Sequence, residues 1–339
     1  MKTYRVWVPE INKAELSEFD FDKKINNPNE VVLKNLFSHI SAGTELACLA
    51  GLESFFPIPN VPGYTAVAEI VEKGSNVPFS VGDVVYTYGP HAAYFKIDIT
   101  DRWHGVCVKV PEGLEHDVAA FTHMAGIAMT AIRVSEIELG DKVAITGLGA
   151  IGILAGQLAR LQGAMVFGTD PEEFRRNLAL QCRIDAVIDP AATHPADEIR
   201  RLTGGEGVST LIEASGYSAA LESMLDAVAL NGEIILLGSP RNPYQTNLTE
   251  TLRHFHLLPW NHTLKGALEF TFPTQPIPFV KHSIERNAQI IMNLMKEGKL
   301  NIEPIYTHRL SPSLAAMAYE GLRNRKDEFV GVVFDWSQL

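Results

Sequence analysis

The sequence has few cysteines and lacks the signals of disulfide-rich, secreted or membrane-spanning proteins. Only three cysteines, Cys48, Cys107 and Cys182, occur among 339 residues. Their odd number and wide spacing disfavour a disulfide framework and a CxxC metal site, so we expect reduced thiols. No apolar run is long enough to span a bilayer, and the chain does not open on a basic and apolar signal. We therefore expect a cytoplasmic protein with no membrane partner.

Runs of positive charge are also missing. The chain carries 29 Lys and Arg residues against 40 Asp and Glu residues, which gives a formal net charge of −11. An acidic surface without basic runs disfavours nucleic acid as a partner and favours a small-molecule substrate. A hydrophobic content of 46% over 339 residues can bury a substantial core and predicts two domains.

One glycine-rich stretch, residues 142–170, organises the rest of the chain. It opens with a short β-branched run at 143–145, which predicts a buried parallel strand. Gly147, Gly149 and Gly152 follow in a G-x-G-x-x-G pattern. In such a turn the first glycine allows the bend, the second lets a pyrophosphate approach the backbone, and the third lets the next helix pack closely. Strand, turn and helix in this register predict a dinucleotide site.

The residues after the turn have the spacing of a helix. Its first residues, Ala150 and Ile151, should present free N–H groups and a positive dipole end to a phosphate. The apolar positions that predict this helix are Ile153, Leu154, Leu158 and Leu161.

The acidic residue after the next strand predicts which dinucleotide binds. The strand at 165–169 ends at Asp170, whose carboxylate can accept hydrogen bonds from a ribose 2′-OH and repels a 2′-phosphate. This favours NAD over NADP as the cofactor. Arg175 and Arg176 could instead pair with that phosphate; we interpret them as a solvated helix face, or Arg175 as a planar lid on the adenine.

The first 85 residues show a different pattern. Short apolar runs at 4–8, 31–37 and 66–72 are separated by Asn, Pro and Gly, which predicts a β-rich domain. After Asp170 the pattern alternates again. We expect strands at 186–188, 210–213, 232–237 and 265–267 with helices at 195–202 and 219–229, then helices near 290–296 and 314–322 and a strand at 330–334.

Several short motifs occur in a fixed order along the chain. They are ISAGTEL at 40–46, VPGYTAVAEIV at 61–71, VGDVVY at 81–86, VKVPEGL at 108–114, the glycine turn, IEASG at 212–216 and GEIILLGSP at 232–240. With these motifs the chain resembles the medium-chain dehydrogenase/reductase superfamily, which contains the zinc alcohol dehydrogenases and their zinc-free relatives. The resemblance implies an α/β fold with a Rossmann doubly wound parallel sheet at 123–272. It also implies a discontinuous β-rich, GroES-like catalytic domain from 1–122 and 273–339, and a homodimer or homotetramer.

The resemblance also implies further cofactor contacts. Ala214 and Ser215 match residues that pass beneath the adenosine and ribose half of the dinucleotide, and Gly238 and Ser239 match residues close to the nicotinamide ribose. A narrower similarity, ISAGTE followed by PGY, is to the dehydrogenases that oxidise a hydroxyethyl group on bacteriochlorophyllide.

Departures from the zinc-bearing members predict that no metal binds. Those members carry a cysteine ligand in a G-[IV]-C-G-[TS]-D motif, where this chain has Ala42. They carry histidine, or in some cases glutamate, in a P-G-H-E motif, where this chain has Tyr64 and Thr65. His123 lies at or next to the third ligand position, and one histidine does not hold a tetrahedral zinc. The cysteine-rich lobe of the structural zinc is replaced by a short turn at 88–92.

Without zinc, a side chain must handle the proton of the reacting hydroxyl. Thr44 matches the family's hydroxyl residue, His123 could serve as general base, and Tyr64 could serve as donor or acid. Each also has a structural interpretation: Thr44 as a hydroxyl in a turn, His123 as a histidine at the start of a helix, and Tyr64 as an aromatic residue of the core. Glu45 and His39 flank the first motif, and we expect Glu45 to be structural.

Three functions remain open. The first is a zinc-independent NAD-dependent dehydrogenase of a secondary alcohol, with a sugar, cyclitol or polyol as the candidate substrate. The second is an NADPH-dependent quinone or enone reductase, which Asp170 disfavours. The third is a non-catalytic dinucleotide-binding protein.

Three histidines, His254, His256 and His262, suggest a cleft wall or a subunit interface rather than a metal site.

Overall fold

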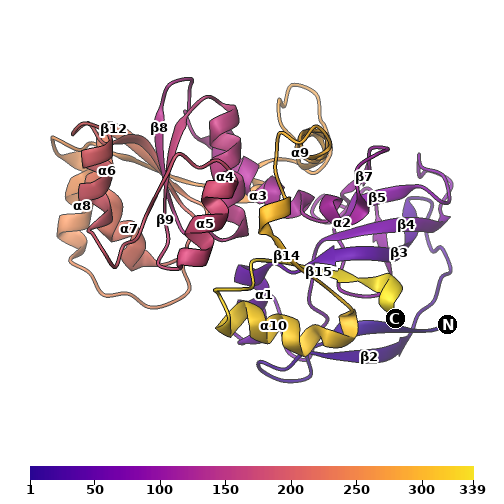
Figure 1. The fold of residues 1–339 in the computed structure, drawn as a ribbon. Helices are drawn as coiled ribbons and strands as arrows, with labels where there is room; N and C mark the ends of the chain where they lie inside the picture. The colour runs from indigo at the N-terminus through magenta and orange to yellow at the C-terminus, as the bar shows by residue number, and fades with distance from the viewer. The chain divides into compact units, whose positions relative to one another are not determined.

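The computed structural model describes residues 1–339 and divides them into two compact units. Unit 1 comprises Met1–His123 and Phe270–Leu339, and unit 2 comprises Met124–Glu269. In Figure 1 both ends of the chain, indigo and yellow, belong to unit 1. The sequence analysis placed the two boundaries at 122/123 and 272/273, within three residues of those in the structure.

Unit 2 contains the doubly wound parallel sheet that the sequence predicts. Its six strands have the order β10-β9-β8-β11-β12-β13, and every neighbouring pair is parallel. The chain builds one half outward from β8 and the other outward from β11, so the order reverses between these two strands. Such a reversal leaves a crevice at the carboxyl ends of the strands, where ligands bind. The strands are β8 (Lys142–Thr146), β9 (Met165–Thr169), β10 (Ala186–Ile188), β11 (Val208–Glu213), β12 (Val228–Leu236) and β13 (Thr263–Gly266).

Helices cover both faces of this sheet. Figure 1 shows α4 and α5 on one face and α6, α7 and α8 on the other. Val143, Ala144 and Ile145 of β8 are at most 1% exposed, as expected for a parallel strand covered on both sides. The helices are α3 (Thr122–Val134), α4 (Ala150–Leu161), α5 (Glu173–Gln181), α6 (Pro195–Leu202), α7 (Ser218–Met224) and α8 (Leu248–His256).

One helix of unit 2 is shorter than predicted. The sequence analysis expected a helix over 219–229, but α7 ends at Met224, a 3-10 turn follows, and β12 begins at Val228. Val228 pairs with Val208 of β11, and the register then shifts before Glu233 pairs with Thr210. The prediction was wrong there because the buried apolar residues Leu225, Ala227 and Val228 fit a helix or a strand equally well, and the tertiary pairing decides.

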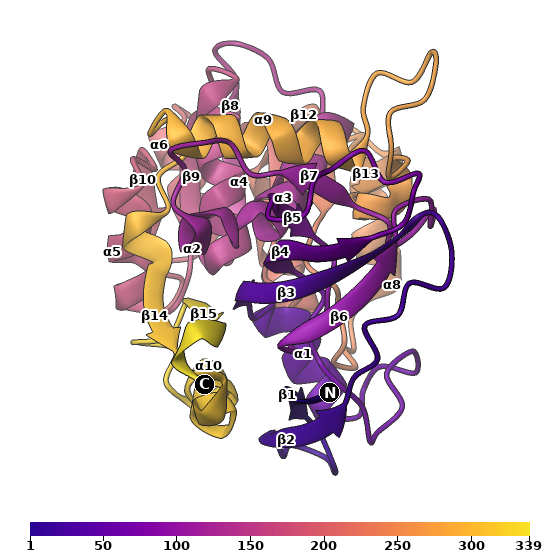
Figure 2. The same ribbon diagram turned by 90° about the vertical axis from the view of Figure 1, so that its right-hand side faces the viewer.

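Unit 1 is the β-rich unit. Its larger sheet has the order β14-β15-β3-β4-β5-β7, with β6 also paired to β3, and a separate hairpin joins β1 to β2. Figure 2 shows the N-terminal strands and the C-terminal α10, β14 and β15 within this unit. The strands are β1 (Lys2–Trp7), β2 (Glu15–Asp20), β3 (Glu30–His39), β4 (Ala66–Lys73), β5 (Val84–Thr87), β6 (Tyr94–Asp98), β7 (Cys107–Lys109), β14 (Tyr306–Leu310) and β15 (Gly331–Asp335).

Four helices complete unit 1, and one of them carries the first motif. The residues of this motif form α1 rather than a loop, and the sequence analysis did not predict this helix or β2. No helix in the structure has both the length and the apolar character needed to cross a membrane. The helices are α1 (Ala42–Leu49), α2 (His116–Ala119), α9 (Ile284–Lys296) and α10 (Ala315–Asn324).

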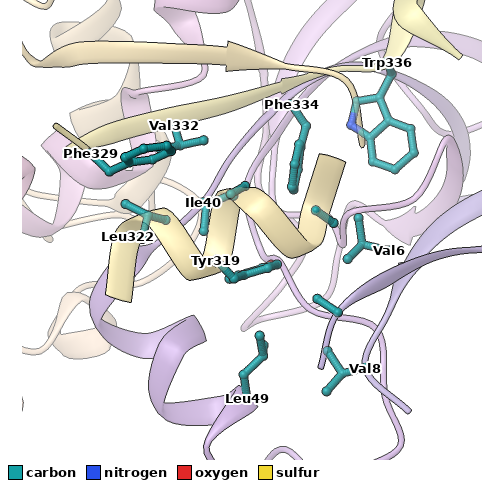
Figure 3. Close-up of a cluster of buried hydrophobic side chains, with 13 residues drawn as sticks. Val6, Val8, Ile40, Leu49, Tyr319, Leu322, Phe329, Val332, Phe334 and Trp336 are labelled. Atoms are coloured by element: carbon teal, nitrogen blue, oxygen red, sulfur yellow. The ribbon is translucent and has the colours of Figure 1, made fainter. Parts of the chain in front are cut away.

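A buried apolar cluster fixes α1 in place. Figure 3 shows Tyr319 and Leu322 of α10 facing Ile40, the first residue of the motif, and Leu49, the last residue of α1. Phe334 of β15 belongs to the same cluster and is fully buried. Residues from the two ends of the chain therefore pack together, and their burial holds the motif at 40–46 rigidly.

Candidate active site

The glycine turn of unit 2 is built as the sequence predicts. Gly147 has φ +85°, and a Cβ atom there would lie 2.8 Å from Ser215 Cα. A Cβ atom on Gly152 would lie 1.9 Å from Gly147 O, so only glycine lets α4 approach the turn. Gly149 differs from both, because a Cβ atom there would meet nothing within 4 Å. The open space over Gly149 fits the close approach of a phosphate to the backbone.

The N-terminus of α4 opens onto the same space. The helix begins at Ala150, and no side chain caps it at Gly149. The backbone N–H groups of Ala150 and Ile151 therefore remain available to a ligand, together with the positive end of the helix dipole. An uncapped helix end beside an open glycine is a suitable cradle for the pyrophosphate of a dinucleotide.

Asp170 lies directly after β9, at the carboxyl edge of the sheet, and is 4% exposed. Its Oδ2 accepts a hydrogen bond of 2.8 Å from Leu148 N inside the glycine turn, and its Oδ1 accepts one of 2.9 Å from Glu172 N. These two donors fix the carboxylate against the turn. A carboxylate has about four acceptor positions, so capacity remains for ribose hydroxyls.

The two arginines near Asp170 do not form a solvated helix face, so that interpretation was wrong. Arg176 donates to Asp170 O at 2.7 Å and to Pro171 O at 2.8 Å, and it pairs with Asp189 at 3.1 Å. Its side chain is only 13% exposed. Arg175 Nη1 lies 4.0 Å from Asp170 Oδ2, and its side chain is 20% exposed. Arg176 is therefore committed to the protein backbone, whereas Arg175 remains close to the carboxylate.

The ends of β11 and β12 meet beside the glycine turn, at the buried residue Glu213. Glu213 is 3% exposed and accepts hydrogen bonds from Thr146 Oγ1 at 3.2 Å and Ser215 N at 2.8 Å. Gly238 N donates to Glu213 O at 2.7 Å. The predicted residues Ala214, Ser215, Gly238 and Ser239 thus surround a residue that the sequence analysis quoted only as part of a motif.

In unit 1 the structure brings His123 and Tyr64 together. His123 is 3% exposed and is the second residue of α3. Its Nδ1 lies 3.2 Å from Tyr64 O, and the two rings meet edge to face at 4.9 Å. The ring of Tyr88 stacks on His123 at 4.2 Å with an interplanar angle of 3°. Two aromatic rings therefore hold the imidazole, and the sequence analysis did not predict Tyr88, which lies in the turn at 88–92.

Ser41 connects Tyr64 to the first motif. The hydroxyl of Tyr64 donates to Ser41 Oγ, and Ser41 N donates to Glu45 Oε1 at 2.7 Å. Thr44, the third predicted catalytic residue, lies half-buried in the first turn of α1. The sequence analysis did not predict Ser41. Its position directly before Ala42, inside the first motif, is the signal that could have identified it.

Glu45 is the centre of a buried hydrogen-bond network. Its Oε2 lies 3.0 Å from His91 Nε2 and accepts a hydrogen bond of 2.6 Å from Tyr319 OH. Burial, and after it the Glu45 carboxylate, raises the pKa of Tyr319. His91 Nδ1 in turn lies 2.8 Å from Ser38 Oγ. These contacts agree with the expectation that Glu45 is structural, because each fixes α1 to another part of unit 1.

His39 is buried nearby in a different environment. It is 1% exposed, packs edge to face on Phe121 at 4.4 Å, and forms no hydrogen bond through either ring nitrogen. Burial, followed by the neighbouring His91 and His123, lowers its pKa to about 3. His39 is therefore neutral near pH 7 and contributes no charge to the cluster.

Two positions of the motifs that hold zinc ligands in the zinc-bearing relatives carry side chains that do not bind zinc here. Ala42 begins α1, and Thr65 is fully buried with its hydroxyl oxygen in no hydrogen bond. Nowhere in residues 1–339 do three His, Cys, Asp or Glu side chains gather as a metal site requires.

The histidines of unit 2 do not converge either. The rings of His254 and His262 are 5.7 Å apart, whereas His256 is exposed. Burial is the main cause that lowers the pKa of His262 to about 4.

Comparisons with known proteins agree with this construction. A family model described as zinc-binding dehydrogenase matches residues 150–279. The D-guloside 3-dehydrogenase of Escherichia coli K12 is 31% identical over 280 residues, covering 80% of this chain and 77% of that protein. The L-threonine 3-dehydrogenase of Pyrococcus furiosus is 28% identical over 331 residues, covering 87% and 88%. The structure of galactitol-1-phosphate dehydrogenase from Escherichia coli superimposes with a TM-score of 0.83 over 98% of this chain and 99% of that chain at 18% identity, which shows a shared fold.

Proposed function

The chain belongs to the medium-chain dehydrogenase/reductase superfamily, and from this premise we propose that it is a zinc-independent oxidoreductase that transfers hydride between a secondary alcohol and NAD. Members of the family use a nicotinamide dinucleotide, and the glycine turn of unit 2 fits one. The observation that carries the proposal is the open space over Gly149 beside the uncapped N-terminus of α4.

The choice of NAD is supported by the placement of Asp170. Its carboxylate is fixed by Leu148 N and Glu172 N at the edge where the adenosine ribose of a dinucleotide is expected. A 2′-phosphate at this place would bring a second negative charge close to a buried one. Arg176 does not offset that repulsion, because its guanidinium is bonded to two carbonyls and to Asp189.

The absence of zinc is supported by the chemistry of three side chains. A catalytic zinc needs three protein ligands that supply sulfur, imidazole nitrogen or carboxylate oxygen. Ala42 has no donor atom, and Thr65 offers only a buried hydroxyl. His123 is then the one strong donor among the compared positions, and it is enclosed by the rings of Tyr64 and Tyr88.

Proton handling then falls to the side chains of unit 1. The nicotinamide, when bound, supplies or accepts the hydride. With Nδ1–H donating to Tyr64 O, His123 has its basic lone pair on Nε2, the atom that would take the hydroxyl proton. The Tyr64 hydroxyl is oriented by Ser41 Oγ and would hydrogen-bond the reacting oxygen. Thr44 in α1 would share in orienting that oxygen.

The substrate class is supported by one relative. The D-guloside 3-dehydrogenase, at 31% identity, is named for a sugar derivative, and a sugar, cyclitol or polyol is among the substrates that the sequence analysis left open. We therefore propose a hydroxyl group of a sugar or polyol as the reacting group.

The proposal is tested by a substrate panel with metal-depleted protein. Chelator-treated enzyme is incubated with NAD and a series of sugars, polyols and aryl alcohols, and NADH is followed by its absorbance. Turnover of a polyol without zinc is the expected result. Turnover that appears only after zinc is added would overturn the metal-free part, and reduction of quinones with NADPH alone would replace the proposal with the reductase alternative.

A further inference from the structure

The carboxylate of Glu213 is a buried negative charge at the edge of the dinucleotide crevice. Its Oε1 accepts from Thr146 Oγ1, Ser215 N, Ser215 Oγ and Gly216 N, and its Oε2 accepts from Gly216 N at 3.1 Å. Each of these partners donates to it, and a carboxylate anion satisfies them all. No Lys or Arg of unit 2 forms an ion pair with it, so hydrogen-bond donors alone stabilise this charge.

The fold places this charge next to Gly238, which matches a residue close to the nicotinamide ribose, and next to Ser215, which matches a residue of the adenosine half. Asp170 follows β9, which lies on one side of β8, and marks the adenosine end. The pyrophosphate lies at the glycine turn after β8, so the other half of the dinucleotide must extend over the ends of β11 and β12. Glu213 is the last residue of β11, and a Cβ atom on Gly238, just after β12, would lie 3.0 Å from Glu213 Oε2.

The two forms of the cofactor differ in charge at that end. The nicotinamide ring is a cation in NAD⁺ and neutral in NADH, while the pyrophosphate and both riboses are the same. A fixed negative charge within several ångströms attracts the cation and leaves the neutral ring nearly unaffected. The effect of the charge therefore appears in the ratio of the NAD⁺ and NADH dissociation constants. Effects on the pyrophosphate and riboses, which both forms share, cancel in this ratio.

We propose that Glu213 selects the redox form of the bound cofactor: its buried charge favours NAD⁺ over NADH and so favours alcohol oxidation over carbonyl reduction. This inference rests on the proposed function, because it requires a nicotinamide dinucleotide in unit 2. It gives Glu213 an electrostatic role in addition to joining the ends of β8, β11 and β12.

A second buried glutamate in the same sheet provides a matched control. Glu233 of β12 is 7% exposed, accepts from Thr210 Oγ1 at 3.0 Å and pairs with Lys265 at 2.8 Å. It lies near the amino ends of the strands, because it is aligned with Thr263, the first residue of β13. Its charge is paired with Lys265, and it lies three residues along β12 from Leu236, which pairs with Glu213.

The test measures two dissociation constants in each variant of the full chain. NADH is titrated by fluorescence and NAD⁺ by calorimetry, for wild type, Glu213→Gln, Glu213→Asp and Glu233→Gln. Glu213→Gln should raise the ratio Kd(NAD⁺)/Kd(NADH) about tenfold, as a screened unit charge several ångströms away predicts. Glu213→Asp keeps the charge and should leave the ratio within about twofold of wild type, even if both affinities fall. Glu233→Gln should not change the ratio.

A ratio that stays constant in Glu213→Gln, with both affinities weakened equally, would show a purely structural role and overturn the inference. If Glu213→Gln does not fold by circular dichroism, Glu213→Asn replaces it and is compared with Glu213→Asp, which has the same length but keeps the charge. Glu213→Asn should raise the ratio above that of Glu213→Asp, and equal ratios in the two variants would again overturn the inference. If wild type binds neither dinucleotide, the proposed function fails as well, and this outcome is distinct from an unchanged ratio.

Discussion

The dinucleotide edge of unit 2 consists mainly of backbone groups, whereas the cluster around His123 in unit 1 consists of side chains. The first consists of glycines, backbone N–H groups and a helix end, with Asp170 and Glu213 as its buried charges. The second consists of rings and hydroxyls, in which Tyr88 and Tyr64 pack on His123 and Ser41 holds the Tyr64 hydroxyl. A backbone site tolerates change except at a few glycines, whereas a side-chain site is remade by single substitutions. A change of side chains in unit 1 therefore need not disturb the glycine turn of unit 2.

The largest effect should come from the closest backbone contact in unit 2. Gly152→Ala places a methyl group 1.9 Å from Gly147 O if nothing moves. The helix must shift, so we expect a loss of roughly 3 kcal/mol in the free energy of unfolding. NADH binding should also weaken by about a hundredfold or more, because the turn leaves the phosphate position. Thermal unfolding and an NADH titration measure both.

Gly149→Ala is the control for that prediction. The added methyl group meets nothing within 4 Å, so stability should change by less than about 1 kcal/mol. The methyl group does occupy the space expected for the pyrophosphate, and NADH affinity should therefore still fall. If Gly152→Ala and Gly149→Ala both bound NADH as tightly as the wild type, the glycine turn would not be the dinucleotide site.

In unit 1 the corresponding test removes the proposed base. His123→Gln should lower kcat by about a hundredfold to a thousandfold, the range that one general base contributes. The NADH dissociation constant should stay within about twofold, because the residues proposed here to contact the cofactor all lie in unit 2. Steady-state kinetics with a substrate from the panel, beside the NADH titration, separates the two quantities. An unchanged kcat would remove His123 from the mechanism.

The buried His39 makes the stability of unit 1 sensitive to acid. Its pKa is near 3 in the folded chain and ordinary, about 6.5, in the unfolded chain. The unfolded state therefore binds the proton more readily, and stability is full above pH 6.5 and falls as the pH drops toward 3. The expected slope is up to about 1.4 kcal/mol per pH unit from this residue. Denaturant unfolding at several pH values measures it.

His39→Phe should reduce that slope, because Phe has no proton to bind and can fill a similar space against Phe121. His262, whose pKa is near 4, supplies an internal comparison in unit 2. A slope that stays the same in His39→Phe and decreases in His262→Phe would assign the acid sensitivity to unit 2 instead.

The smallest effect should come from removing one hydroxyl. Tyr64→Phe keeps the ring against His123 but loses the hydroxyl that donates to Ser41, so kcat should fall by about tenfold to a hundredfold. Tyr88→Phe is the matched control, because the ring that stacks on His123 remains. Equal losses in the two variants would argue against a distinct role for the Tyr64 hydroxyl.

The sequence predicted the parts of the molecule that depend on near neighbours. Gly147, Gly149, Gly152 and Asp170 lie within 24 residues, and their spacing alone determines the turn and the strand that follows it. The doubly wound sheet and the β-rich first unit were likewise predicted from local patterns and from the family motifs.

The parts that were missed depend on distant partners. Glu45 accepts from Tyr319, which is 274 residues away, and Ser41 is joined to Tyr64, which is 23 residues away. Arg176 was interpreted as solvated because an arginine on the surface of a helix usually contacts water. In the structure its guanidinium instead donates to two carbonyls and to Asp189. Only the folded chain brings such groups together, and no local pattern specifies them.

The most direct test of the central claim is a titration of chelator-treated protein with NADH and with NADPH, followed by the fluorescence of the reduced ring. The account predicts that NADH binds without metal and more tightly than NADPH, because Asp170 occupies the edge where a 2′-phosphate would lie. Tighter binding of NADPH, or binding that returns only when zinc is restored, would contradict it.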